Sequence, residues 1–219
     1  MGKLIGFIGG TGDQGKGLVM RLAREGQTVL VGSRNDEKGM AAAKEMNEKI
    51  GSENICGMTN NEVAHHADIL FVTVPFENAI PTLKDLVPHF KKGLILVDVT
   101  VPLVIEKGFF TVQEEVFESG AERIQAELGD KVTVAAAFKT ISAHALAELD
   151  KPMDCDAFVA CNDKDARAEI IELAKHVKNI RPMDAGKLKS CRVIERMTGF
   201  LININKKYKV KESGIRVTM

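Results

Sequence analysis

The stretch that decides the fold is IGFIGGTGDQGKGLVMRL, residues 5–22. An apolar run at 4–9 is typical of a buried strand, and apolar residues at helical spacing follow it. Between them stand Gly10, Gly12 and Gly15, in the spacing G-x-G-x-x-G. We expect Gly10 to permit a tight turn, Gly12 to let the backbone approach a phosphate, and Gly15 to let the helix pack against the strand. The start of a helix favours negative charge, so the sequence predicts a dinucleotide pyrophosphate there rather than a merely flexible turn.

The end of the second predicted strand, VGSRNDEK at 31–38, indicates which dinucleotide is bound. Proteins that bind NAD usually carry Asp or Glu here, to hold the ribose 2′-hydroxyl. This chain has Gly32 at that position, followed by Ser33 and Arg34. Ser33 can donate a hydrogen bond, Arg34 offers a planar fork for a phosphate, and Lys38 adds a second positive charge. This pattern favours NADP over NAD; a solvated polar helix cap is the alternative.

Apolar, β-rich runs alternate with helical patterns along the rest of the chain. We predict further strands at 28–33, 69–75, 94–100, 132–138, 156–161 and 179–185, and helices at 15–25, 36–50, 61–66, 78–87, 118–128, 143–149, 165–177 and 187–208. Most strand runs are apolar throughout, as in parallel strands covered on both faces. The predicted fold is α/β: a Rossmann-type, doubly wound, mainly parallel sheet with a small C-terminal helical extension. We expect one domain over 1–219, in which a dinucleotide-binding core to about residue 140 is completed by residues 141–219.

The amino-acid composition limits the kinds of partner that the protein is expected to bind. The 30 basic and 30 acidic residues balance, so nothing indicates a nucleic-acid partner. The sequence has no run of about 18 apolar residues, so no membrane span is predicted. The cysteines, Cys56, Cys155, Cys161 and Cys191, form no C-x-x-C pair and have no suitably spaced histidine. We interpret them as reduced thiols of a cytoplasmic protein and expect no metal site.

In sheets of this kind the ligand lies beyond the carboxyl ends of the strands. The loops there are 73–79, 99–103 and 138–145, which should frame the nicotinamide and its hydride acceptor. They hold no carboxylate pair and no Ser/His/Asp constellation, so we assign no catalytic residue. The Tyr-x-x-x-Lys pair of short-chain reductases is absent as well, because the one tyrosine, Tyr208, is followed at that spacing by Glu212.

Nearly end to end, the sequence resembles the NADPH:coenzyme F420 oxidoreductase family. The matching pieces are GGTGDQGKGL (9–18), VGSRNDEK (31–38), TVPFENAI (73–80), KTISAHALAEL (139–149), RPMDAGKL (181–188) and SGIRV (213–217). The first two are shared with other NADP proteins. RPMDAG before a long helix and a short tail is more discriminating.

The resemblance implies NADP and coenzyme F420 as the partners, with direct hydride transfer between nicotinamide C4 and deazaflavin C5. It implies dinucleotide contacts from Thr11, Gly12, Asp13 and Gln14 at the pyrophosphate, from Ser33, Arg34 and Lys38 at the 2′-phosphate, and from Val74, Asn78, Val101 and Ala143 at the ribose and nicotinamide end. The deazaflavin would be fixed near Thr140 and Ile141 and by the tail around Gly214 and Ile215. Lys139 either meets an anionic acceptor or is a solvated lysine.

Several alternatives stay open. The acceptor of an NADPH reductase with this fold can also be a flavin, a metal chelate or a small C=N or C=O compound, and a non-catalytic NADPH-sensing module is a third reading. His144 either relays a proton or lies idle on a helix face. The apolar last helix exceeds what one protomer can cover, so we expect a homodimer.

Overall fold

The computed structural model describes residues 2–113 and 118–219. Its main feature is an eight-stranded sheet. The strands, in the order in which they lie, are β10 (Ile180–Gly186), β9 (Cys155–Cys161), β8 (Thr133–Ala136), β5 (Ile95–Asp98), β4 (Ile69–Val72), β1 (Ile5–Ile8), β2 (Val29–Ser33) and β3 (Ile55–Thr59). All pairs are parallel except β8 with β9, where the direction reverses. The predicted mainly parallel sheet is therefore confirmed.

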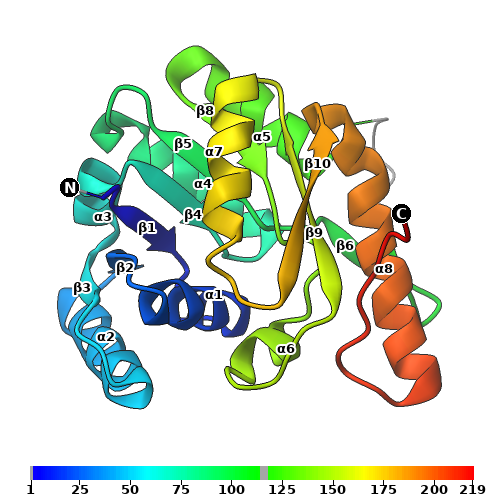
Figure 1. The fold of residues 1–219 in the computed structure, drawn as a ribbon. Helices are drawn as coiled ribbons and strands as arrows, with labels where there is room; N and C mark the ends of the chain where they lie inside the picture. Colours follow the sequence, from blue (N-terminus) through cyan, green and yellow to red (C-terminus); the bar gives the residue numbers. More distant parts are fainter. Residues whose placement is uncertain (1, 114–117) are drawn as a thin grey trace.

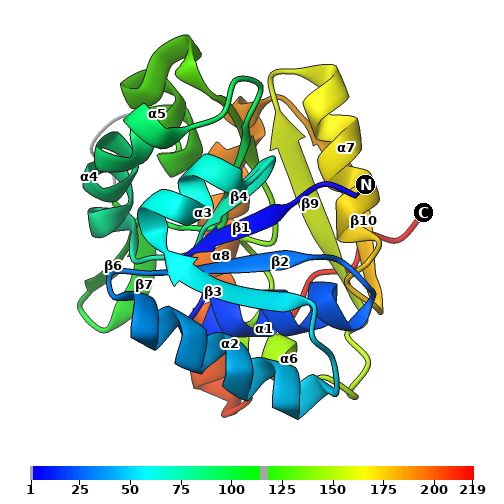
Figure 2. The ribbon, with the colours of Figure 1, turned by 90° about the vertical axis from the view of Figure 1, so that its left-hand side faces the viewer.

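Helices cover both faces of this sheet (Figures 1 and 2). One core lies under α1 (Asp13–Arg24), α2 (Asp36–Ile50), α6 (Ala143–Ala147) and α7 (Lys164–Ala174). The other lies under α3 (Asn60–His66), α4 (Phe76–Leu86), α5 (Gly120–Leu128) and α8 (Cys191–Tyr208). The short 3₁₀ turns are Val87–His89, Gly129–Lys131 and Leu188–Ser190. Strands β1, β4, β5 and β8 are buried almost completely, which is why their sequences are apolar throughout.

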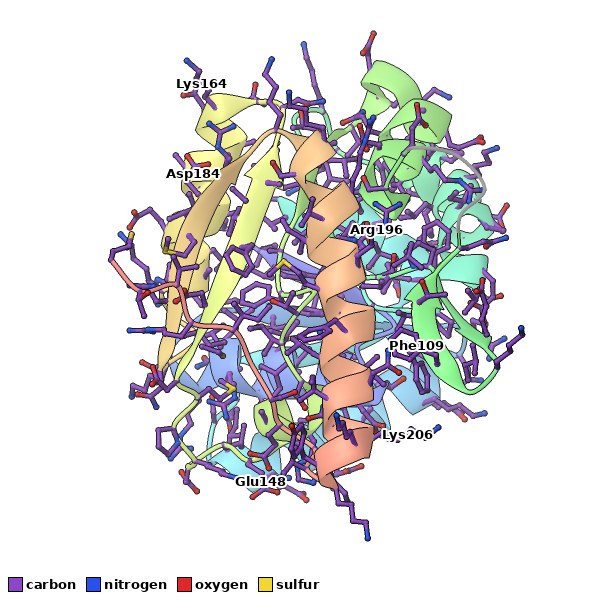
Figure 3. The ribbon with its side chains drawn as sticks, turned by 90° about the vertical axis from the view of Figure 1, so that its right-hand side faces the viewer. Phe109, Glu148, Lys164, Asp184, Arg196 and Lys206 are labelled. Carbon is purple, nitrogen blue, oxygen red and sulfur yellow. The ribbon has the colours of Figure 1, made fainter. Side chains whose placement is uncertain are left out.

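Three strands were not predicted from the sequence. Strand β3 forms the edge of the sheet beside β2, and a separate hairpin joins β6 (Leu103–Glu106) to β7 (Phe109–Val112). The hairpin turn is Lys107-Gly108, both with positive φ, 49° and 82°. It packs on α8, where the Asn203 amide donates to the Phe110 carbonyl at 2.7 Å and accepts from the Phe110 N–H at 2.9 Å. Figure 3 shows α8 lying along the surface with this hairpin beside it.

After α8 the tail returns across the molecule to the sheet. The Asp156 N–H of β9 donates to the Ile215 carbonyl at 2.7 Å, and the Asp156 carboxylate accepts from the Val217 N–H at 2.7 Å. The same carboxylate takes two hydrogen bonds, each of 2.8 Å, from the Arg181 guanidinium of β10. The tail is thus fastened to the sheet through one buried aspartate. Within residues 2–113 and 118–219, every helix is too short or too polar to cross a membrane.

Candidate functional site

The glycine turn after β1 leads directly into α1. Gly10 lies inside the tight turn, in which the Gly12 N–H donates to the Gly9 carbonyl at 3.0 Å, and the residue with positive φ, 84°, is Gly9. Gly10 is also needed for packing, since a Cβ there would lie 2.9 Å from the Phe7 Cβ. Gly12 is the N-cap of α1, and no side chain caps the helix. The N–H groups of the first helical turn therefore point outward without a side-chain partner, as an anion site requires.

Two glycines of the motif differ in the space around them. A Cβ on Gly15 would lie 2.6 Å from the Gly9 carbonyl oxygen and 2.7 Å from the Gly10 Cα. This confirms that Gly15 permits close packing of the helix against the turn. A Cβ on Gly12 would meet only the Gly9 carbonyl oxygen, at an ordinary 3.4 Å. The protein itself leaves room above Gly12, which fits the approach of a pyrophosphate.

The carboxyl end of β2 presents exposed positive charge. Arg34 and Lys38 are exposed, and within the described parts of the chain neither forms an ion pair. Asn35 caps α2 by accepting from the Lys38 N–H at 3.0 Å. At Gly32, a Cβ would lie 2.5 Å from the buried Asn60 Oδ1, so an acidic side chain has no room there. The geometry suits a 2′-phosphate and excludes the carboxylate typical of NAD sites.

A cleft of about 600 Å³ opens beside the glycine turn. Its walls come from the start of α1, from the loops after β4, β5 and β8, and from α8 with the tail that follows. Of the residues predicted for the site, it brings together Gly12, Asp13, Gln14, Val74, Val101, Lys139, Thr140, Ile141 and Ala143. Thr11 and Asn78 are exposed and do not line the cavity.

Gln14 ties two walls of the cleft together. Its side-chain amide donates to the Phe138 carbonyl at 3.1 Å and to the Ile141 carbonyl at 3.4 Å. The side chain that was expected to meet the pyrophosphate therefore also holds the loop after β8. Arg21, farther along α1, adds a second tie by donating to the carbonyls of Ala145, Leu146 and Glu148 at the end of α6.

Lys139 contradicts both of its expected roles. Its side chain is 1% exposed, so it is neither a solvated lysine nor a cation facing an acceptor. The ammonium lies 2.6 Å from Asp98 Oδ2 and 3.1 Å from Glu195 Oε1, and donates its remaining hydrogen bond to the Thr100 carbonyl. Burial acts to lower the pKa of this ammonium, but the two carboxylates hold it above its ordinary value.

The tail residues expected at the acceptor also need correction. Gly214 packs against β9, where a Cβ would lie 2.7 Å from the Cys155 Cβ, and Ile215 bonds to the backbone of that strand. Gly214 lines only a smaller neighbouring cavity of about 80 Å³. Two earlier tail residues, Lys211 and Ser213, line the main cleft instead.

One face of α8 forms a wall of the cleft that sequence reasoning missed. Thr198, Leu201, Ile202 and Asn205 line it. The available signal was the seven-residue spacing of two polar residues, Thr198 and Asn205, within an otherwise apolar helix face. His144 also lines the cleft; it is exposed, and its Nδ1 lies 3.0 Å from Glu212 Oε1.

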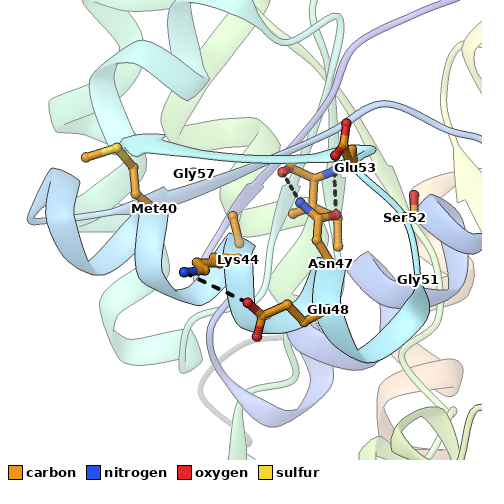
Figure 4. Close-up of a pocket in the computed structure, with 10 residues that line it drawn as sticks. Met40, Lys44, Asn47, Glu48, Gly51, Ser52, Glu53 and Gly57 are labelled. Carbon is orange, nitrogen blue, oxygen red and sulfur yellow. Dashed lines mark hydrogen bonds and ion pairs between the residues drawn. The ribbon is translucent and has the colours of Figure 1, made fainter.

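A second hollow, between α2 and β3, does not have the character of a site (Figure 4). Its volume is about 720 Å³, but it is shallow, and several of its polar groups are paired with one another or with the backbone. The Asn47 amide bonds the Ile55 carbonyl at 2.8 Å and the Ile55 N–H at 3.1 Å, and Lys44 lies 3.9 Å from Glu48. In the described ranges no three His, Cys, Asp or Glu residues gather as a metal would need.

Comparison with known proteins agrees with this geometry. Residues 4–102 match the family model described as NADP oxidoreductase, coenzyme F420-dependent. The chain is 41% identical to the F420-dependent NADP reductase of Methanothermobacter marburgensis, over 98% of this chain and 97% of that protein. It is 38% identical to the enzyme of the same name from Methanocaldococcus jannaschii, over 98% of this chain and 97% of that protein.

The same fold is found in a crystal structure of a candidate F420-dependent NADP reductase from Arthrobacter sp. FB24. The TM-score is 0.82 at 22% identity, with 99% of both chains covered. A glycine turn open to a pyrophosphate, a cationic end of β2 and sequence identity over almost the whole length lead to one conclusion: the chain belongs to the family of F420-dependent NADP reductases.

Proposed function

We propose that the protein transfers a hydride between NADP(H) and coenzyme F420 in the cleft beside the glycine turn. The observation that carries this proposal is the common opening of two sites into one cavity. The start of α1 (Gly12, Asp13) and the acceptor-side loop (Thr140, Ile141) line the same space of about 600 Å³. Membership of the F420-dependent NADP reductase family supports the choice of both partners.

The residues divide the binding between them. We assign Thr11, Gly12, Asp13 and Gln14 to the pyrophosphate, Ser33, Arg34 and Lys38 to the 2′-phosphate, and Val74, Asn78, Val101 and Ala143 to the ribose and nicotinamide. The backbone of Thr140 and Ile141 holds the acceptor ring, together with Lys211 and Ser213 of the tail in place of Gly214 and Ile215. Residues to about 140 and residues 141–219 act as one unit, since each supplies part of the cleft.

The bound partners supply the chemistry, a hydride passing directly between nicotinamide C4 and deazaflavin C5. What the chain supplies is the approach of the two rings and the exclusion of water, and no covalent intermediate is needed. The mainly apolar walls, which include Val74, Phe76, Val99 and Leu201, suit two stacked rings.

Purified protein mixed with NADPH and F420 tests the proposal. We expect rapid loss of the deazaflavin absorbance with stoichiometric oxidation of NADPH. Turnover only with a flavin, a metal chelate or a C=N or C=O compound would replace F420 as the acceptor. Tight NADPH binding without turnover on any acceptor would instead identify a sensing module.

We also propose that the protein is a homodimer and acts in the cytoplasm. Val193, Phe200 and Tyr208 are exposed along α8, and Ile105 and Phe109 are exposed on the adjacent hairpin (Figure 3). Large exposed apolar residues on neighbouring elements are typical of a surface that binds another protein. The four cysteines are free thiols, which suits a reducing compartment.

Light scattering after size exclusion tests the dimer. We expect Phe200→Asp to produce monomers, because burying an unpaired charge in an apolar interface costs roughly several kcal/mol of association free energy. Met40→Asp, at an exposed apolar residue of α2 remote from this face, is the matched control and should stay dimeric. A monomeric wild type would overturn the dimer proposal.

A further inference from the structure

Beneath the cleft lies a buried cluster of three charges, defined by Lys139, Asp98 and Glu195. Their side chains are 1%, 0% and 1% exposed. Every ammonium proton of Lys139 has an acceptor, in Asp98, Glu195 and the Thr100 carbonyl. The cluster carries one net negative charge, part of which the start of α5 offsets.

The carboxylates have further partners that close the cluster. Asp98 Oδ1 accepts from the Thr100 N–H at 2.9 Å and from the Thr100 hydroxyl at 2.6 Å. Glu195 accepts from the N–H groups of Gly120 at 2.9 Å and Ala121 at 3.4 Å, at the start of α5. A buried ion pair adds little net stability compared with apolar packing, so stability alone does not account for three charges here.

The cluster joins three walls of the cleft at their buried base. Asp98 ends β5 just before Val99, Thr100 and Val101, while Glu195 belongs to α8, one turn before Thr198. Lys139 begins the loop 139–144, which lines the acceptor side. Besides this cluster, the Thr198 hydroxyl of α8 joins two of these segments by donating to the Lys139 carbonyl.

The acceptor-side loop needs such an anchor. Phe138, immediately before it, has a left-handed backbone with φ of 57°, which is unfavourable for a bulky residue. Three bonds hold this stretch in place: Gln14 bonds to the Phe138 carbonyl, the Thr198 hydroxyl donates to the Lys139 carbonyl at 3.0 Å, and the Lys139 ammonium enters the cluster. Of these, only the ammonium reaches both β5 and α8.

We propose that Lys139 is a positioning residue that sets the separation of the acceptor-side loop, the loop after β5 and α8, and through it the approach of the two rings. This inference rests on the proposed hydride transfer. Lys139 contacts neither partner through its ammonium. It acts through Thr140 and Ile141, and its effect is therefore felt on the acceptor side and not at the pyrophosphate.

Removal of the lysine has two effects, which a second variant separates. Lys139→Met breaks the tie between the three segments, and it also leaves two buried carboxylates without their cation. The titratable groups that face the ammonium are Asp98 from β5 and Glu195 and Cys191 from α8. Burial raises the pKa of the Cys191 thiol to about 12, so this group stays neutral at the pH values of interest.

Three variants test the proposal. For Lys139→Met at pH 8 we expect kcat/KM for F420 to fall roughly 10²-fold, as a misplaced wall implies, with NADPH affinity changed by no more than about twofold. Lys139→Met/Asp98→Asn restores one net negative charge but not the tie between β5, α8 and the loop, so kcat/KM for F420 should stay about as low as in the single variant. Lys91→Met removes another lysine–aspartate pair, 2.8 Å from Asp68 at the opposite end of the strands, and should behave as wild type.

Hydrogen exchange of the amides of residues 138–142 provides a readout that needs no turnover. These amides should exchange faster in both Lys139→Met and the double variant than in wild type. Wild-type exchange and kinetics in Lys139→Met would overturn the inference. Recovery of activity and of slow exchange in the double variant would do so too, since it would show that the unbalanced carboxylate charge, and not the lost tie, caused the effect. If wild-type protein does not reduce or oxidise F420, the proposed function fails, while the exchange measurement still decides the role of Lys139.

Discussion

In the proposed site, the preference between NADP and NAD depends most on an exposed guanidinium, that of Arg34, with Ser33 and Lys38 beside it. Arg34 directly follows β2 and has no acidic partner among the described residues. The nearby position of Gly32 has no room for a carboxylate side chain. A charge-assisted hydrogen bond contributes about 1.5–3 kcal/mol. The side chain therefore distinguishes the two dinucleotides through the 2′-phosphate alone.

We expect Arg34→Ala to weaken NADPH binding by about 10- to 100-fold and to leave NADH binding nearly unchanged. Isothermal titration with both dinucleotides measures the difference. Arg24→Ala, at the far end of α1 where the side chain pairs with Asp150 at 2.7 Å, is the control and should change neither. Equal losses for NADPH and NADH would contradict the assignment of the 2′-phosphate.

Substitutions at two glycines of the turn test dinucleotide binding and folding stability separately. We expect Gly12→Val to abolish binding of both dinucleotides with little change in melting temperature, because the protein leaves open space there. Gly15→Ala should lower the melting temperature, since its Cβ meets backbone atoms at 2.6 and 2.7 Å. Melting curves with and without NADPH check both. Unchanged NADPH affinity in Gly12→Val would rule out a pyrophosphate at this turn.

At the scale of elements, Asp156 of β9 fastens the end of the C-terminal tail to the sheet. The hydrogen bonds from Arg181 hold the pKa of this carboxyl below its ordinary value, despite burial, which acts in the opposite direction. A depressed pKa means that the ionised form stabilises the native state above the ordinary carboxyl pKa of about 4. That contribution is lost as the pH falls through the lowered value.

Asp156→Asn should therefore cost about 1.5–3 kcal/mol of unfolding free energy at pH 7, and the difference from wild type should shrink as the pH falls below about 4 and vanish only below the lowered pKa. Denaturant titrations at several pH values measure it. Asp154→Asn removes a neighbouring carboxylate that is 86% exposed and should have a small effect at every pH. A pH-independent loss in Asp156→Asn would argue against the ionised clamp.

Each element that the sequence did not predict lacks the local pattern by which such an element is usually recognised. β3 reads ICGMT and is an edge strand, half exposed, so it lacks the apolar run of its buried neighbours. Its Gly57 is needed because a Cβ would lie 2.1 Å from the Gly39 carbonyl oxygen, a contact that only the folded chain creates. The hairpin turn uses Lys107 at positive φ, where Asn or Asp is the usual signal.

Local patterns located the glycine turn between β1 and α1 and the cationic residues after β2, because a few adjacent residues define each of them. The ligand contacts assigned to these residues stay predictions, and what depended on distant contacts was wrong or missed. Lys139 was misjudged because its partners, Asp98 and Glu195, lie 41 and 56 residues away in sequence, and no local pattern pairs them. The wall from α8 was missed for the same reason.

For the whole molecule, the reversal at β9 matters most. Because β9 and β10 run opposite to the other strands, the chain after β10 continues along α8 and then returns to the sheet through the tail. The last quarter of the described chain therefore lines the cleft together with the start of α1 and the loops after β4, β5 and β8. Gln14 joins the start of α1 to the loop after β8.

Gln14 stands at the start of α1, where we place the pyrophosphate, and its amide fastens the opposite wall. A dinucleotide that orders this side chain also orders the binding site of the acceptor. Thermodynamic linkage then requires each ligand to raise the affinity for the other by the same factor, typically about 5- to 150-fold. Titrating NADP⁺ and oxidised F420 together, a pair between which no hydride passes, should give two equal factors, both falling toward unity in Gln14→Leu. An excess of both oxidised partners would then hold the protein in a ternary complex that cannot react. Through this one amide, the turnover rate would depend on how much of the NADP and F420 in the solution is oxidised.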